Sequence, residues 1–336
     1  MAPVITPVTT SHVMPDATTV VIIGGGIVGL TAALTLAERN IPVVVLEKGR
    51  IAGEQSSRNL GWIRKTSRAL EDIPLAQAAD RLWAEMATRV GCDVGYRQAG
   101  IMFIARNEMQ MAMHEKWLKG VCTVGLDTRL LSDSEIAAHV PGGAKKWAGG
   151  IFTASDGRAE PTLAASAIAK AAIAKGALVI EQCAVRALAT SNGKVSGVVT
   201  ERGEIRCDQV LLAAGAWSRR FLGNHDINLP TLPLICSVMR TKPLNGPANI
   251  AVGAPDFSFR KHQDGGFIIT QRGALDAPLT LDHLLIGTRY LPQLRHARDN
   301  LRISLGKYFV KDLALARRWR NDRRSPFEHI RTPIRH

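Results

Sequence analysis

The chain has 336 residues, and its 46% hydrophobic and 21% charged residues are typical of a folded globular protein rather than a disordered or fibrous one. The net charge is +14, and residues 289–336 contain thirteen Lys and Arg against four Asp and Glu. Since no nucleic-acid motif accompanies these charges, we expect a solvated basic face and no nucleic-acid partner, with a peripheral contact to an anionic membrane surface left open.

Residues 1–18 have neither a basic start nor an apolar run, so they are predicted to form a flexible leader rather than a signal peptide. No apolar stretch of about eighteen residues follows, which argues against a spanning helix. The five cysteines form no C-x-x-C pair, which argues against disulfides and zinc and favours buried thiols in a reducing compartment. We therefore expect a cytoplasmic protein without a metal.

The next segment predicts a βαβ unit. Residues 19–24 (TVVIIG) are typical of a strand buried on both faces, GIVGLTAALTLAERN has helical spacing, and IPVVVLE is a second buried strand. Gly24-x-Gly26-x-x-Gly29 lies between strand and helix, where the glycines permit a tight turn and close approach of a pyrophosphate. Glu47 closes the second strand, where a carboxylate binds ribose hydroxyls and repels a 2′-phosphate. A dinucleotide other than NADP is predicted.

The middle of the chain alternates predicted helices with strands after a long polar loop, residues 47–65. The expected elements are an amphipathic helix over 74–90, a strand in 96–106, a helix from about 108, a short helix that Ser132 caps in the capping box SDSE, and an Ala-rich helix over 161–175.

The last part of the chain predicts two groups of strands. Residues 177–217 indicate successive strands with turns at Asn192-Gly193 and Arg202-Gly203. Residues 230–272 alternate apolar and polar side chains, which is typical of an antiparallel sheet, and residues 279–315 have helical periodicity. This order predicts an α/β protein, a discontinuous Rossmann-like domain with an inserted α+β domain.

Four motifs in this order resemble the glycine oxidase/D-amino-acid oxidase (DAO) family of FAD-dependent oxidoreductases. They are the βαβ unit ending in Glu47-Lys48, the loop SSRNLGW, the segment DGRAEPTLAASAIAKAAIAKGA and the late AAGAWS. The resemblance implies an FAD-binding domain of residues 19–70 plus 145–225 and a substrate domain of residues 71–144 plus 226–336. Family members continue further, so we expect this chain to lack the C-terminal segment that returns to the FAD domain.

The resemblance also implies which residues contact FAD. In chain order they are Gly24, Gly26, Ile27, Val28 and Gly29 at the pyrophosphate; Glu47 and Lys48 at the adenosine ribose; Ser56, Ser57 and Arg58 along the pyrophosphate and ribityl chain; Asn59, Gly61 and Trp62 near the isoalloxazine; Val185 at the adenine; and Ala214, Gly215 and Trp217 on the flavin side.

In this family the flavin accepts a hydride from the α-carbon of an amine, so no acid–base pair is required. Arg64 and Arg260 are candidate partners of a substrate carboxylate. The implied function is oxidation of the C–N bond of an amino acid or related amine, with O₂ or a quinone as electron acceptor. One alternative is an inactive remnant or partner-binding subunit that keeps the FAD scaffold, either as an oligomer or with a subunit that completes the site. A second alternative is an NAD-dependent dehydrogenase.

Overall fold

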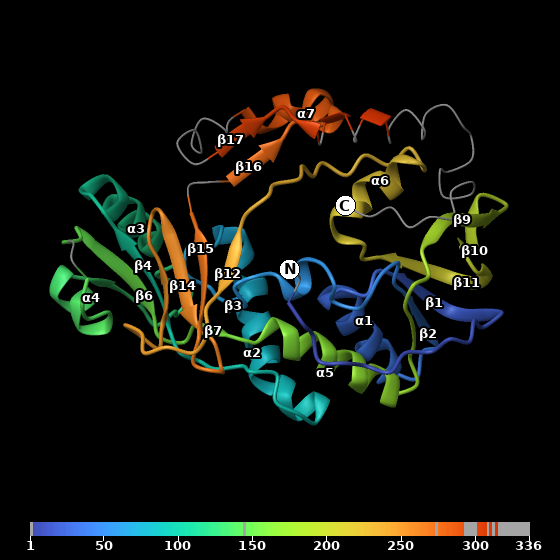
Figure 1. Ribbon diagram of the computed structural model, residues 1–336, viewed down its shortest axis with the longest axis horizontal. Coiled ribbons are helices and arrows are strands. Elements are labelled where there is room, and N and C mark those ends of the chain that lie inside the picture. Colours follow the sequence, from blue (N-terminus) through green and yellow to red (C-terminus); the bar gives the residue numbers. More distant parts are fainter. Residues whose placement is uncertain are drawn as a thin grey trace.

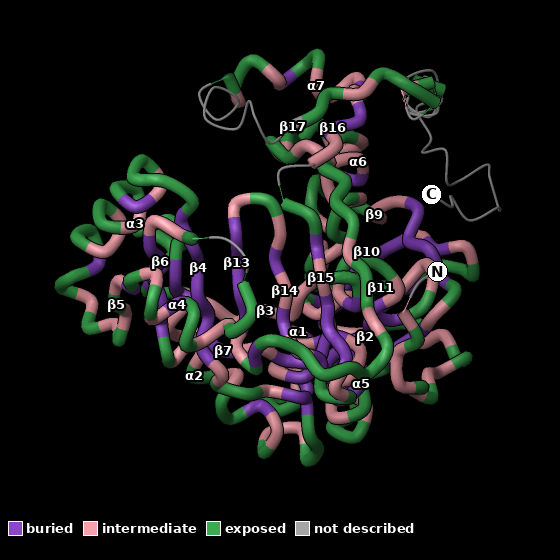
Figure 2. The backbone as a smooth tube through the Cα atoms, turned by 60° about the vertical axis from the view of Figure 1, so that its left-hand side comes forward, coloured by how far each residue is buried: buried purple, intermediate pink, exposed green. Residues whose placement is uncertain are grey.

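The chain folds around two β-sheets that lie side by side in the computed structural model (Figure 1). Described are residues 3–143, 146–272, 275–291 and 301–314, apart from 308, 311 and 312. Figure 2 shows that buried residues gather in the strands of both sheets and in the helices packed against them. This arrangement confirms the predicted fold class, a Rossmann-like α/β domain joined to an α+β domain.

The first sheet has six strands in the order β8-β2-β1-β11-β10-β9. Its strands are β1 (Ala17–Ile23), β2 (Val43–Leu46), β8 (Leu178–Ile180), β9 (Val185–Ser191), β10 (Lys194–Thr200) and β11 (Gly203–Leu212). β1 lies parallel to β2 and β11, and β2 lies parallel to β8. Helices α1 (Ile27–Ala37) and α5 (Pro161–Ala174) pack on the sheet with Leu30, Leu34 and Ile168 fully buried, so the predicted βαβ unit is confirmed.

Strands β9, β10 and β11 form the predicted antiparallel strands, with two changes in detail. The turn at Asn192-Gly193 is confirmed, because both residues have positive φ between β9 and β10. The second turn lies one residue earlier than predicted, because Gly203 already pairs with Thr200. The residues GEIRC therefore continue into DQVLL as one ten-residue strand, β11, rather than belonging to the strand before.

The second sheet has seven strands in the order β12-β15-β14-β13-β4-β6-β5. They are β4 (Ile101–Ala105), β5 (Thr128–Leu131), β6 (Gly149–Thr153), β12 (Val238–Arg240), β13 (Ala251–Gly253), β14 (Phe257–Lys261) and β15 (Phe267–Gln271). Helices α3 (Glu108–Gly120) and α4 (Asp133–His139) lie at its β5–β6–β4 end (Figure 1). The capping box predicted at Ser132 is confirmed, because Ser132 and Glu135 exchange backbone and side-chain hydrogen bonds.

A smaller unit lies above both sheets in Figure 1. It contains the parallel strands β16 (Leu275–Pro278) and β17 (Leu301–Ser304) and the short helix α7 (Leu281–Ile286), which a 3₁₀ turn, η4 (Gly287–Tyr290), continues. An ion pair of 2.8 Å between Asp282 and Arg219 ties this unit to α6 (Ser218–Gly223). The helical periodicity over residues 279–315 thus predicted α7 but was wrong at β17, which is a strand.

The N-terminal segment is ordered against the first domain, so the prediction of a flexible leader was wrong. The hydroxyl of Ser166 on α5 donates to the carbonyl of Thr6 at 2.7 Å, and the backbone N–H of Ser11 donates to Val179 at 2.8 Å. The side chains of Ile5 and Val8 pack against the core beneath α1 and α5. The leader therefore covers an apolar face that would otherwise contact water.

The predicted domain boundaries differ from the observed packing at two places. Strand β6 lies within the seven-stranded sheet, although residues from 145 onward were expected in the FAD-binding domain. Helix α2 (Ile73–Val90) was expected in the substrate domain, yet its Met86 is buried in the cluster that contains α1 and α5. In the part of the chain that the structure describes, no helix is both long and apolar enough to span a membrane.

The cysteines only partly follow the prediction of buried thiols. Cys183 and Cys207 are buried in the first domain, whereas Cys92, Cys122 and Cys236 are exposed, and all five are free. Burial raises the pKa of the thiols of Cys183 and Cys207, which makes these two poor nucleophiles.

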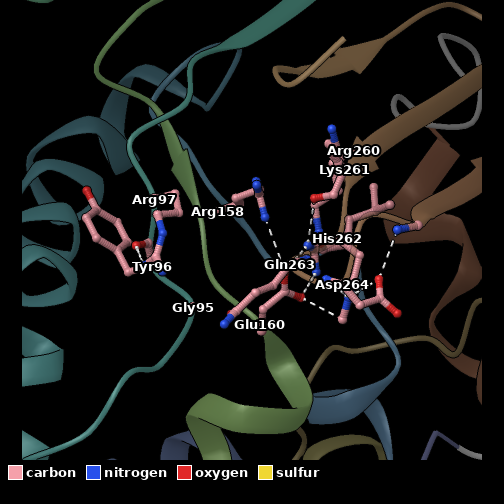
Figure 3. Close-up of polar contacts among 12 residues, drawn as sticks. Gly95, Tyr96, Arg97, Arg158, Glu160, Arg260, Lys261, His262, Gln263 and Asp264 are labelled. Atoms are coloured by element: carbon pink, nitrogen blue, oxygen red, sulfur yellow. Dashed lines mark hydrogen bonds and ion pairs between the residues drawn. The ribbon is translucent and has the colours of Figure 1, made fainter. Parts of the chain in front are cut away.

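A buried ion pair between Glu160 and Arg260 joins the two domains (Figure 3). Glu160 precedes α5 in the first domain, Arg260 lies on β14 of the second, and both side chains are fully buried. The two Nη atoms of Arg260 donate to the two Oε atoms of Glu160 at 2.7 Å each. The Arg260 Nε–H donates to the carbonyl oxygen of Leu60 in the long polar loop, so three separate segments meet at one guanidinium.

We expect Glu160→Gln to lower the free energy of unfolding by about 3–5 kcal/mol, because it leaves the buried charge of Arg260 without a counter-charge. Chemical denaturation of the variant and the wild type measures the difference. Glu204→Gln, at an exposed carboxylate on β11, is the matched control and should change stability by less than about 0.5 kcal/mol. A loss below about 1 kcal/mol in Glu160→Gln would contradict this role for the pair.

Candidate functional site

The glycine turn is closed against the end of β11. Gly24 has φ +113°, and a Cβ on it would lie 2.5 Å from the carbonyl oxygen of Ala213 and 3.1 Å from the Cα of Ala214. A Cβ on Gly29 would lie 2.1 Å from the carbonyl oxygen of Gly24. These two positions therefore require glycine, and the turn lies beside the AAGAWS segment despite nearly 200 intervening residues.

The N-terminus of α1 offers an anion-binding site. Its first turn has no acidic side chain, and the backbone N–H of Ile27 donates to the hydroxyl of Ser56 at 2.9 Å. A Cβ on Gly26 would lie 3.1 Å from that same hydroxyl, so the glycine keeps the helix terminus open to the polar loop. Helix amides, a hydroxyl and the positive end of the helix dipole fit the pyrophosphate of a dinucleotide. Val28 in the same turn is exposed.

Glu47 is held in place by backbone donors at the end of β2. Its Oε2 accepts from the N–H of Gly25 at 2.8 Å and its Oε1 from the N–H of Gly49 at 2.7 Å. Burial raises the pKa of Glu47, and the two backbone hydrogen bonds oppose that shift. Each carboxylate oxygen can accept a further hydrogen bond, so the side chain fits the ribose hydroxyls that the sequence assigned to it.

Trp217 lies beside Lys48, with the Nζ of Lys48 4.4 Å from the centroid of the Trp217 ring. Ala214 lies against Gly24 in the glycine turn, and Gly215 lies near Gln55 in the polar loop. The contact of these three residues with the flavin side of FAD stays a prediction.

The segment that leads into β9 lies against the same region. The N–H of Cys183 donates to the carbonyl oxygen of Glu47 at 2.9 Å, and the N–H of Gln182 donates to that of Gly49 at 3.0 Å. Val185, two residues further, is buried at the start of β9. Its contact with an adenine stays a prediction.

The polar loop folds on itself before it enters the interface between the domains. Arg58 is half exposed and pairs with Glu54 at 3.5 Å, and Ser57 is buried. The side chain of Asn59 accepts from the N–H of Gly61 at 2.7 Å. Gly61 has φ +68°, and a Cβ on it would lie 2.3 Å from the carbonyl oxygen of Ala159, so the loop can pass this point only as glycine.

Beyond Gly61 the chain forms the short strand β3 (Trp62–Ile63), which pairs with β7 (Gly157–Arg158). Asp156, just before β7, accepts from the backbone N–H groups of Lys65 at 2.8 Å and Thr66 at 3.2 Å. Burial raises the pKa of Asp156, while these hydrogen bonds and the charge of Lys65 lower it. This buried carboxylate fixes the backbone of the two residues that follow Arg64.

Arg64 lies near Arg272, an arginine that was not among the candidates predicted from the sequence. Each guanidinium carbon is 5.4 Å from the centroid of the Phe103 ring, and Trp62 meets that ring edge to face at 5.6 Å. Burial, with the positive charges of Arg68 and Arg272, lowers the pKa of Arg64 to about 10, so it stays protonated at neutral pH. Among the described residues no carboxylate lies within 4.0 Å of either guanidinium.

The two candidate arginines from the sequence therefore have opposite surroundings. Arg64 lies beside the Phe103 ring, donates to the carbonyl oxygen of Thr66 and feels the negative charge of Asp156, whereas Arg260 is fully buried and neutralised by Glu160, so we no longer expect Arg260 to meet a substrate. The strand register contained a signal for Arg272. Arg260 pairs with Ile268, and by alternation Arg272, one residue beyond the end of β15, falls on the same face at the other end of the strand.

Comparison with known proteins identifies relatives over most of the chain. The profile of a family described as FAD dependent oxidoreductase matches residues 19–327. The structure of L-amino acid deaminase from Proteus myxofaciens, in complex with anthranilate, superposes with a TM-score of 0.90 at 32% identity over 98% of this chain and 75% of that one.

Two curated relatives are more distant. Glycine oxidase from Geobacillus kaustophilus is 27% identical over 64% of this chain and 59% of its own length. Sarcosine dehydrogenase from Mus musculus is 25% identical over 71% of this chain, which spans only 27% of that protein. The chain thus matches only part of the length of these relatives.

We expect Gly29→Ala to weaken FAD binding at least about tenfold, because a Cβ 2.1 Å from the Gly24 carbonyl forces α1 away from the turn. Fluorescence titration of the purified chain with FAD measures the dissociation constant. Gly223→Ala is the matched control, since a Cβ there meets nothing within 4 Å. Equal FAD affinity in Gly29→Ala and Gly223→Ala would show that the turn does not hold the cofactor.

Proposed function

The chain belongs to the FAD-dependent oxidoreductase family that its residues 19–327 match, and from this premise we propose that it oxidises the C–N bond of an α-amino acid. FAD is the cofactor of the family, and the glycine turn, the α1 terminus and Glu47 fit its ADP half. Family membership argues against the alternative of an NAD-dependent dehydrogenase.

The observation that supports an amino acid rather than a simple amine is the pair Arg64 and Arg272. Two guanidiniums beside Phe103, neither with a carboxylate within 4.0 Å in the described part of the chain, suit a substrate carboxylate, because a guanidinium binds both carboxylate oxygens through parallel hydrogen bonds. The Phe103 ring that both guanidiniums adjoin packs edge to face against Trp62. The related deaminase was solved with anthranilate, itself a carboxylate on an aromatic ring.

When bound, FAD supplies the acceptor for the hydride that leaves the α-carbon. The substrate amine loses that hydride and one proton to become an imine, which water converts to an oxo acid and ammonia. Arg64 and Arg272 orient the α-carbon by fixing the carboxylate. Their positive charge also disfavours the protonated amine, and only the neutral amine can lose a hydride. O₂ or a quinone then accepts the electrons.

The direct test uses the full chain reconstituted with FAD and mixed without oxygen with L-amino acids, D-amino acids or sarcosine. We expect the visible flavin absorbance to bleach with at least one class of amino acid. A protein that takes up no FAD, or a flavin that no amine reduces, would refute the proposal and favour a non-enzymatic scaffold.

Arg272→Gln is expected to raise KM for the amino acid about 10- to 100-fold, since a charge-assisted hydrogen bond contributes about 1.5–3 kcal/mol. Arg272→Lys should recover part of the loss, because it restores the charge without the planar fork. A matching amine that lacks the carboxylate should react equally with all variants. Arg39→Gln, at an exposed arginine, is the control for a lost charge. An unchanged KM in Arg272→Gln would exclude carboxylate binding by this residue.

A further inference from the structure

A cavity of about 330 Å³ opens where the turn between β14 and β15 meets the segment between α2 and β4 (Figure 3). Its polar lining includes Arg97, Arg158, Lys261, His262 and Gln263. No residue assigned above to FAD or to the substrate carboxylate lines it. The Glu160–Arg260 pair separates it from the polar loop, since Glu160 bonds Arg158 while Arg260 bonds the Leu60 carbonyl.

The charges around this cavity are not balanced. Glu160 is shared by two arginines: it accepts from Arg158 Nη1 at 3.1 Å and pairs fully with Arg260. Arg97 pairs with Asp93 at 2.9 Å, and Lys261 has a neutral partner, donating from Nζ to the Asn249 Oδ1 at 2.9 Å. Within the described part of the chain, four cations thus face two carboxylates, an excess of two positive charges.

Arg158 is the centre of this imbalance. Its side chain is only 12% exposed, and its buried Nε–H has no hydrogen-bond partner. Burial lowers the pKa of Arg158, as do the charges of Arg260 and Arg97, while Glu160 opposes the shift. A buried guanidinium with an unused donor is costly unless an acceptor meets it, and Arg158 is one of the residues that line the cavity an anion would enter.

His262 does not remove the excess. Its Nε2 lies 3.1 Å from Glu160 and its Nδ1 lies 2.8 Å from Asp264, which itself pairs with Arg240 at 2.5 Å. Burial lowers the pKa of His262, while the charges of Glu160 and Asp264 raise it. The two groups left to bind a ligand are Arg158 and Lys261.

We propose that this cavity binds a small oxyanion with two negative charges, held between Arg158 and Lys261. Guanidinium and ammonium groups recognise carboxylate and phosphate oxygens alike, so a dicarboxylate and a phosphate share the required chemistry. The cavity volume admits a molecule of that size but not a dinucleotide. The site does not depend on oxidoreductase activity.

Calorimetric titration of the full chain, kept at saturating FAD so that the α1 terminus is filled, tests the site with malonate and with inorganic phosphate. We expect one of the two to bind saturably with one-to-one stoichiometry and to weaken as salt is added. The one that binds more tightly identifies the ligand class. Absence of saturable binding by either anion would overturn the proposal.

Lys261→Gln should weaken binding at least about tenfold, and Arg158→Gln should weaken it further. Lys194→Gln, at an exposed lysine on β10, should bind as the wild type does. In the described part of the chain the Lys261 ammonium donates to a neutral side chain, so its replacement spares the buried ion pairs and decides the question if Arg158→Gln fails to fold. Wild-type affinity in Lys261→Gln would overturn the proposal.

Discussion

The fold depends on one buried ion pair. Glu160 and Arg260 are both fully buried where the two domains meet, and either charge would be costly to bury alone. Their bidentate geometry, with further donors from Gln263 and His262, offsets the desolvation of both groups. Because Arg260 also binds the Leu60 carbonyl, the same pair sets the place of the polar loop between the domains.

The parts of the fold that sequence reasoning predicted are those with local causes. The meander after β8 and the Ser132 capping box depend on residues within one hairpin or one turn, and the βαβ unit depends on the continuous segment 17–46. The glycine turn has such a local cause as well, since Gly29 must avoid the carbonyl of Gly24 only five residues earlier. For the same reason the family resemblance and the chemistry of the residues both assign this motif to the pyrophosphate of a dinucleotide.

The parts that escaped prediction depend on contacts between distant segments. Strand β6 belongs to the second sheet because it pairs with β4, and β4 lies parallel to β13, which is 150 residues later. The leader is ordered because α5 and β8 provide an apolar face for it, which its own composition does not reveal. Trp217 lies beside Lys48, a contact across more than 160 residues. No local pattern contains this information.

The contrast between Arg260 and Arg272 shows how charge compensation separates a structural cation from a functional one. Both lie on one face of the β14–β15 pair, so the alternation of side chains along the strands does not distinguish the two arginines. Glu160 pairs with Arg260, so the charge of Arg260 is neutralised and the pair helps to join the two domains. Phe103 and another arginine, Arg64, lie beside the second, which has no carboxylate within 4.0 Å among the described residues. A like-charged pair in a partly buried setting is unfavourable by itself, and it becomes favourable when an anion lies between the two charges. We propose that the arrangement favours a carboxylate in the folded chain, and the sequence could not reveal it because the decisive fact is where Glu160 lies, not which residues are arginine.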